Sequence, residues 1–144
     1  IVDEVARHTG LVNKFGGDAV LEVFGAPVSL PNPEDEALRA ARAIATRLRA
    51  EVPELKAGIG VTAGQVVAGN VGAKDRFEYT VIGEPVNEAA RLCELAKSTP
   101  ALLLASSDTI NGATEAERRH WTLGETVTLR GHDEPTRLAL PVRN

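Results

Sequence analysis

Asn87 and Arg91 lie four residues apart in a segment whose apolar pattern predicts a helix, so their side chains project from one face. The apolar residues of the segment fall on a different face: Val86, Ala89, Ala90, Cys93 and Ala96. Arginine offers a planar fork of charged donors, and asparagine offers both a donor and an acceptor. The pair therefore suits a phosphorylated substrate, while the competing interpretation from spacing alone is a solvated helix face.

A short run rich in β-forming residues, 79–82, leads into this helix and ends at Gly83. Pro85 stands at the first helical position, where its missing N–H costs nothing. The predicted strand presents Thr80 shortly before the helix presents Asn87 and Arg91. The two elements are therefore expected to direct their polar groups toward one place.

A second stretch, Lys14-Phe15-Gly16-Gly17-Asp18, joins two runs, 11–15 and 19–25, that are typical of strands. A Gly-Gly pair between such runs indicates a hairpin, because both glycines can take positive φ. The turn would place cationic Lys14 and anionic Asp18 near the same end of adjacent antiparallel strands.

Three motifs in this order resemble the catalytic domain of class III nucleotidyl cyclases: K-F-G-G-D at 14–18, G-I-G-V-T-A-G-Q-V-V-A-G-N-V-G at 58–72, and Y-T-V-I-G-E-P-V-N-E-A-A-R-L at 79–92. The likeness extends from residue 10 to about residue 142 and is strongest to bacterial, actinobacterial adenylate cyclases. It implies an α+β fold, a ferredoxin-like sheet with flanking helices. Hairpins and helices between non-sequential strands favour the same class over a doubly wound sheet.

The resemblance implies a role for each motif residue in converting ATP to 3′,5′-cyclic AMP and pyrophosphate. Asp18 matches one of two aspartates that hold two Mg²⁺ or Mn²⁺ ions. Lys14 and Thr80 match the pair that reads the purine, and the family's guanylate cyclases generally place an acidic residue where Lys14 stands. Asn87 matches the residue that orients the ribose, and Arg91 the one that stabilises charge on the phosphates.

The terminal turn departs from the family pattern. Many members carry a second phosphate-binding lysine there, whereas the nearest candidates in L-R-G-H-D-E-P-T are Arg130 and His132. We expect Arg130 to contact substrate phosphate, because His132 would first need protonation. Glu84 and Glu88, which flank Asn87, have no assigned role.

In the family the purine, ribose and phosphate residues come from one protomer and the metal aspartates from the other. The resemblance therefore implies a homodimer with its active site at the interface, used in signal transduction. Two alternatives stay open: a catalytically inactive cyclase-fold module that binds nucleotide or regulates a partner, and a guanylate cyclase.

Length and composition are consistent with one domain, 1–144, with 16 basic and 20 acidic residues. The sequence has no basic block that would suggest nucleic acid as a partner, and no apolar run is long enough to span a membrane. The single cysteine is typical of a reducing cytoplasm. The chain opens in what reads as the end of a helix closed by Gly10. We therefore expect the family's first strand, with the first metal aspartate, to lie upstream together with a sensor or linker domain. This stretch alone should be inactive, and the parent could be cytoplasmic or membrane-anchored.

The remaining pattern predicts the framework around these motifs. A helix is expected at 33–50, whose four arginines (Arg39, Arg42, Arg47, Arg49) would form a solvated face. A hairpin over Ala63-Gly64 would pair 57–62 with 66–71, a buried strand would follow at 101–105 and a short helical turn at 107–111. Residues 112–120 read as a surface connection. A last hairpin, 121–130 with 136–142, would turn Val127, Leu129, Leu138 and Leu140 to one face.

Overall fold

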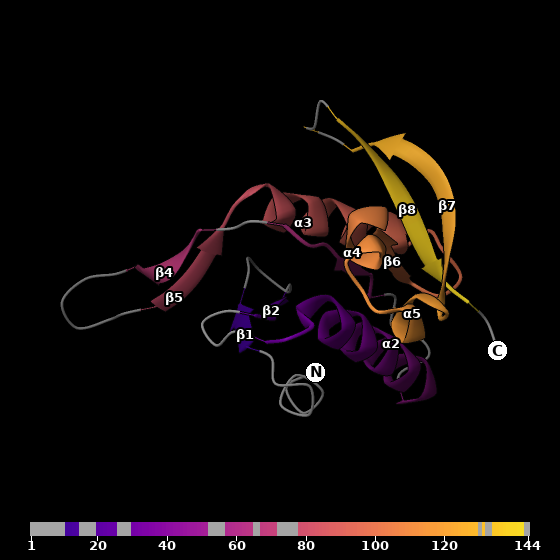
Figure 1. The fold of residues 1–144 in the computed structure, drawn as a ribbon, viewed down its shortest axis with the longest axis horizontal. Helices are drawn as coiled ribbons and strands as arrows, with labels where there is room; N and C mark the ends of the chain where they lie inside the picture. The colour runs from indigo at the N-terminus through magenta and orange to yellow at the C-terminus, as the bar shows by residue number, and fades with distance from the viewer. Residues whose placement is uncertain are drawn as a thin grey trace.

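The computed structural model of the protein describes residues 11–14, 20–25, 30–51, 57–64, 67–71, 78–129, 131 and 134–142; in β1, β4 and β5 the backbone alone is described. Twelve elements lie in these segments (Figure 1): β1 Leu11–Lys14, β2 Val20–Val23, α2 Pro33–Glu51, β3 Ile59–Val61, β4 Val67–Val71, β5 Glu78–Ile82, α3 Glu84–Ala96, β6 Leu103–Ser106, α4 Ser107–Asn111, α5 Glu115–Arg118, β7 Trp121–Thr128 and β8 Pro135–Pro141.

The centre of the fold is a four-stranded sheet in the order β3-β6-β8-β7, in which β3 and β6 are parallel and the other neighbours are antiparallel. Helices cover both faces, with α2 on one side of β6 and α3 on the other (Figure 1). The mixed sheet with flanking helices confirms the predicted α+β class.

Alternation along β6 divides the core into two layers. Leu103 and Ala105 pack with the α2 residues Leu38 and Ala41. Leu104 faces the other way, into a cluster on the α3 side whose further buried members are Leu92, Ala96, Leu129 and Leu138. Val127 and Leu140 pack against this second cluster, which confirms the predicted apolar face of the terminal hairpin.

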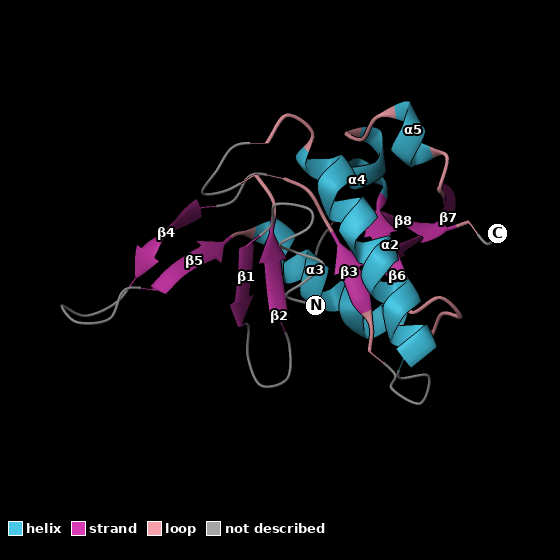
Figure 2. Ribbon diagram, turned by 90° about the horizontal axis from the view of Figure 1, so that it is seen from below, coloured by secondary structure: helices cyan, strands magenta, loops and turns pink. Residues whose placement is uncertain are grey.

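Two smaller antiparallel pairs complete the fold, β1 with β2 and β4 with β5 (Figure 2). The predicted pairing of 66–71 with 57–62 is wrong, because β4 pairs with β5 and β3 pairs with β6. The reason lies just after β3. Thr62 donates its hydroxyl to the Pro85 carbonyl, and Gly64 lies against the Pro85 ring, so the chain follows the start of α3 instead of doubling back.

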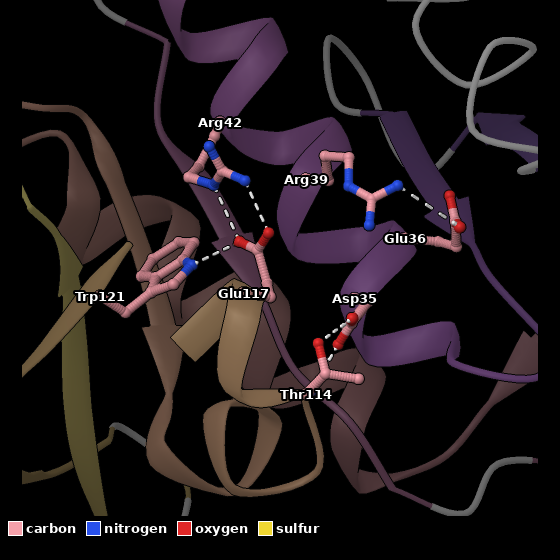
Figure 3. Close-up of polar contacts among 7 residues, drawn as sticks. All are labelled: Asp35, Glu36, Arg39, Arg42, Thr114, Glu117 and Trp121. Atoms are coloured by element: carbon pink, nitrogen blue, oxygen red, sulfur yellow. Dashed lines mark hydrogen bonds and ion pairs between the residues drawn. The ribbon is translucent and has the colours of Figure 1, made fainter. Parts of the chain in front are cut away.

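The segment 112–120 is not a plain surface connection, because it contains α5 and the buried carboxylate of Glu117. Arg42 donates to Glu117 from Nε at 2.8 Å and from Nη2 at 2.6 Å, and the Trp121 indole donates at 2.9 Å (Figure 3). The predicted solvated role is therefore wrong for Arg42. Its partner lies 75 residues away, a separation that no local helix pattern can register.

A second buried carboxylate joins α2 to the segment before α5. Asp35 accepts hydrogen bonds from the backbone N–H and the hydroxyl of Thr114 (Figure 3). Across the described part of the chain, no helix combines the length and the apolar character that a membrane crossing would require.

Candidate active site

The outer face of α3 carries the two residues that the spacing brought together. Asn87 and Arg91 are both exposed, whereas Val86, Leu92 and Ala96 are buried on the sheet side. The amphipathic division predicted for this helix is therefore confirmed. Its start is held by the Gly83 carbonyl, which accepts from the backbone N–H groups of Val86 and Asn87.

The depth at which α3 rests on the sheet is set by glycine. A Cβ built on Gly58 would lie 1.9 Å from the Cys93 carbonyl oxygen, and one built on Gly60 would lie 2.5 Å from the Ala89 carbonyl oxygen. Both distances are far inside van der Waals contact, so the helix backbone lies directly on the strand backbone. The glycine-rich motif at 58–64 thus acts as a groove for α3.

The spacing of these contacts shows why the groove and the helix match. Two strand residues advance by roughly 6.6 Å and four helix residues by roughly 6 Å, so alternate strand positions meet every fourth helix position. The sequence of contacts is Gly58 to Cys93, Gly60 to Ala89, and Thr62 with Gly64 to the same proline, Pro85. The helix therefore runs antiparallel to β3 along its whole groove.

The groove also fixes where Asn87 and Arg91 face. Each lies two residues after a groove contact (Pro85 and Ala89), which is about 200° around the helix. The amide and the guanidinium consequently project away from the sheet, on the side opposite to the glycine groove. That orientation holds both groups on a rigid element and leaves them open to whatever covers this face.

The Cys93 thiol lies on the groove side of α3. Burial raises the pKa of this thiol, with the nearby Glu94 carboxylate acting in the same direction. A thiol that stays protonated at neutral pH is a packing group and not a nucleophile. We therefore assign no chemistry to Cys93.

The other predicted site residues are placed by backbone position or lie outside the described residues. Thr80 is in β5 opposite Gly69, and Lys14 is the last residue of β1, opposite Val20. Asp18, Arg130 and His132 lie outside the described residues. The structure thus brings Asn87 and Arg91 together, and the roles assigned to Lys14, Thr80, Asp18 and Arg130 stay predictions.

One contact at this site has no counterpart in the sequence analysis. Thr136 of β8 donates its hydroxyl to Glu88 Oε2 at 3.1 Å, so the glutamate beside Asn87 is bonded to the terminal hairpin. The two residues are 48 positions apart. The sequence does carry one signal of this contact. Residues 136, 138 and 140 alternate along one face of the last strand, and Thr136 is polar where Leu138 and Leu140 are apolar.

The described residues contain no group of three or more histidine, cysteine, aspartate or glutamate side chains that could hold a metal ion. The metal prediction rests on Asp18, which lies outside the described residues. A hollow of about 420 Å³ lies between α2 and the ends of β6 and β8, lined by Arg42, Arg49 and His120 among others. Its lining includes neither Asn87 nor Arg91, both of which are exposed.

Comparison with solved structures finds this fold in nucleotidyl cyclases. The guanylyl cyclase Cya2 is 28% identical, with a TM-score of 0.82 over 96% of this chain and 72% of that one. The adenylyl cyclase CyaB from P. aeruginosa is 22% identical, with a TM-score of 0.83 over 99% of this chain and 76% of that one. The guanylate cyclase domain of RhGC from Catenaria anguillulae, solved with GTP, is 21% identical with a TM-score of 0.76 over 96% and 75%.

Relatives close in sequence are mycobacterial. The uncharacterized proteins Rv1319c and Rv1320c of Mycobacterium tuberculosis are 72% and 73% identical over 98% and 99% of this chain. The chain spans about a quarter of their length, 26% and 25% respectively. No family model matches the sequence.

Proposed function

We propose that this chain, which has the fold of the class III nucleotidyl cyclase catalytic domains, is the catalytic part of an adenylate cyclase. The observation that carries the proposal is the exposed Asn87–Arg91 pair, held outward by the glycine groove in a fold that matches cyclases over almost the whole chain. In the reaction, the 3′ oxygen of ATP loses its proton and bonds to the α-phosphorus. The bond from that phosphorus to the bridging oxygen breaks, and pyrophosphate leaves.

Arg91 and Asn87 have the chemistry that this step requires. Phosphoryl transfer asks the protein mainly to position the reactants and to stabilise the charge that develops on phosphate oxygens. The guanidinium of Arg91 can donate to those oxygens as a fixed fork, and the Asn87 amide can hold the ribose hydroxyl at the correct distance. One helical turn separates them, so both can contact a single nucleotide.

The remaining roles are proposed from the sequence motifs. Lys14 and Thr80 would read the adenine, and Arg130 would contact phosphate. Asp18 would be one ligand for Mg²⁺ or Mn²⁺, which when bound neutralises phosphate charge and polarises the reacting oxygens. The structural neighbours include both adenylyl and guanylyl cyclases, so the choice of ATP rests on Lys14.

A second copy of the chain is part of the proposal. Asn87 and Arg91 are exposed, whereas electrostatic stabilisation of a transition state is strong only where water is excluded. A homodimer would cover this face and would bring Asp18 of one copy to Arg91 of the other. We further propose that the domain works in the cytoplasm, under the control of a sensor or linker segment elsewhere in the full-length protein.

The test uses the full-length protein, incubated separately with Mn²⁺-ATP and Mn²⁺-GTP, with both cyclic nucleotides measured by mass spectrometry. We expect cyclic AMP as the main product, and a loss of roughly 10²–10³-fold in kcat for Arg91→Ala, the size seen when one oxyanion-stabilising donor is removed. Asp18→Ala should abolish the metal-dependent rate. Arg119→Ala is the matched control, because Arg119 is an exposed arginine paired only at the surface with Glu115.

Each alternative predicts a different outcome. Cyclic GMP as the main product would mean that Lys14 and Thr80 read guanine. A folded protein that makes neither product would favour the inactive regulatory module. Equal losses for Arg91→Ala and Arg119→Ala would show that Arg91 has no special contact with substrate.

A further inference from the structure

We propose that Thr136 is a positioning residue of this site, and that it orients Asn87 and Arg91 by holding Glu88 of the same helix. The inference rests on the proposed function, because the effect is expected on nucleotide chemistry. It concerns a residue that neither the cyclase motifs nor the likeness to known structures singles out.

The contact is between a buried hydroxyl and a carboxylate. Thr136 is 7% exposed, and its Oγ1 donates to Glu88 Oε2 at 3.1 Å. Along β8, alternate residues Leu140, Leu138 and Thr136 face α3, and the two leucines pack in the apolar cluster there. Thr136 is the last residue of this row and lies beside Glu88. The polar residue of the row is therefore the one that contacts the carboxylate.

Glu88 is well placed to transmit this contact. It follows Asn87 directly and precedes Arg91 by three residues, so it lies on the flank of the helix between the buried and the exposed faces. Holding Glu88 consequently limits rotation of the exposed face about the helix axis. The glycine groove sets which side of α3 faces outward, and the Glu88 contact restrains the smaller rotations about the helix axis that a backbone contact still permits.

Two hydroxyls, one just after β3 and one on β8, together restrain the helix. Thr62, next to β3, holds the Pro85 carbonyl in the first turn at 2.6 Å, and Thr136 on β8 holds the second turn. With only the first restraint, a roll of about 5° would move a group at the helix rim by about 0.5 Å. Displacements of that size are enough to slow a reaction that depends on alignment.

Thr136 is the better position for a test than Glu88, because Glu88 makes a further interaction besides this one. In the full-length protein, Thr136→Val removes the hydroxyl and keeps the shape, and Thr136→Ser keeps the hydroxyl. Thr126→Val is the matched control, since Thr126 lies on the same hairpin and is exposed. The measurements are kcat and KM for Mn²⁺-ATP, together with the thermal unfolding midpoint.

We expect Thr136→Val to lower kcat about tenfold with KM changed less than about threefold, as for loss of alignment in the transition state. Thr136→Ser and Thr126→Val should behave as the wild type. In an Arg91→Ala background, Thr136→Val should have a smaller effect, because only Asn87 remains to be oriented. An unchanged kcat, a loss that serine does not restore, or an equal loss in the Arg91→Ala background would each overturn the proposal.

Failure of the proposed function is recognised separately. If the wild type makes no cyclic nucleotide, hydrogen exchange of the backbone amides of α3 replaces the rate measurement. Faster exchange in α3 for Thr136→Val that Thr136→Ser restores would retain the positioning role. Unchanged exchange would refute it.

Discussion

Gly60→Ala should damage the site while leaving every polar residue in place. The added Cβ would lie 2.5 Å from the Ala89 carbonyl oxygen, 2.7 Å from Leu92 Cβ and 2.8 Å from the Cys93 backbone nitrogen. Two of these neighbours are backbone and the third is a Cβ, so none can swing away. A relaxed contact needs about 3.5 Å, which means that α3 must withdraw from β3 by about 1 Å.

The withdrawal has two measurable consequences. Overpacking of this kind costs about 1–3 kcal/mol in the free energy of unfolding, to be measured by urea titration. A displacement of about 1 Å of Asn87 and Arg91 should lower kcat roughly 100-fold, which exceeds the effect of stability alone when the assay is run well below the unfolding midpoint. Activity per folded molecule is therefore the deciding measurement.

Gly112→Ala is the control for glycine replacement itself. Its Cβ would meet only the Glu34 side chain, at 3.1–3.2 Å, and a flexible side chain can shift by the few tenths of an ångström that this contact requires. Its free energy of unfolding should stay within about 0.5 kcal/mol of the wild type. If Gly60→Ala kept both its stability and its rate, the groove would not set the position of α3, and the reasoning from close approach would be wrong.

Three further results are expected. Glu117→Ala should lower the free energy of unfolding, measured by urea titration, by about 3 kcal/mol. This is the low end for breaking a buried ion pair, because Arg42 keeps a quarter of its side chain exposed. The Trp121 indole loses its hydrogen-bond acceptor as well. Burial raises the pKa of the Glu22 carboxyl to about 7, so its stabilising contribution is full below about pH 4.5 and is lost as the pH rises through 7. Glu22→Gln should therefore raise the free energy of unfolding, measured by urea titration, above that of the wild type at pH 8 by about 1 kcal/mol after discounting for solvent, with no gain at pH 4. Because burial raises the pKa of Cys93, iodoacetamide at pH 8 should label this thiol about tenfold more slowly in the folded protein than in urea, as followed by mass spectrometry.

The parts of the fold that the sequence predicted well are those that depend on residues close together in the chain. The two faces of α3 follow from a 3.6-residue period, and the outward placement of Asn87 and Arg91 from their separation of four. Gly58 and Gly60 in the predicted strand 57–62 indicate a close backbone approach on one side, although not which element approaches. The apolar face of the terminal hairpin was likewise a local pattern.

The parts that the sequence did not predict depend on partners far along the chain. β4 has the same local character whether it pairs with β3 or β5, and the choice was made by Thr62 and Gly64 meeting Pro85. Arg42 became a buried partner because Glu117 arrives from 75 residues away. A charged residue on a helix face is interpreted as solvated unless its tertiary partner is known. The sequence therefore predicts local apolar packing better than it predicts distant charged contacts.

The arrangement separates the proposed phosphate chemistry from the proposed choice of base. Asn87 and Arg91 stand on a helix packed into the four-stranded core, where β3 fixes its depth. Lys14 and Thr80 belong to two-stranded pairs outside that sheet. Residues in such pairs can change without disturbing the packing under α3, so one core can serve enzymes that differ in substrate. That division is consistent with a fold shared by adenylyl and guanylyl cyclases, and it explains why overall structural likeness does not distinguish ATP from GTP.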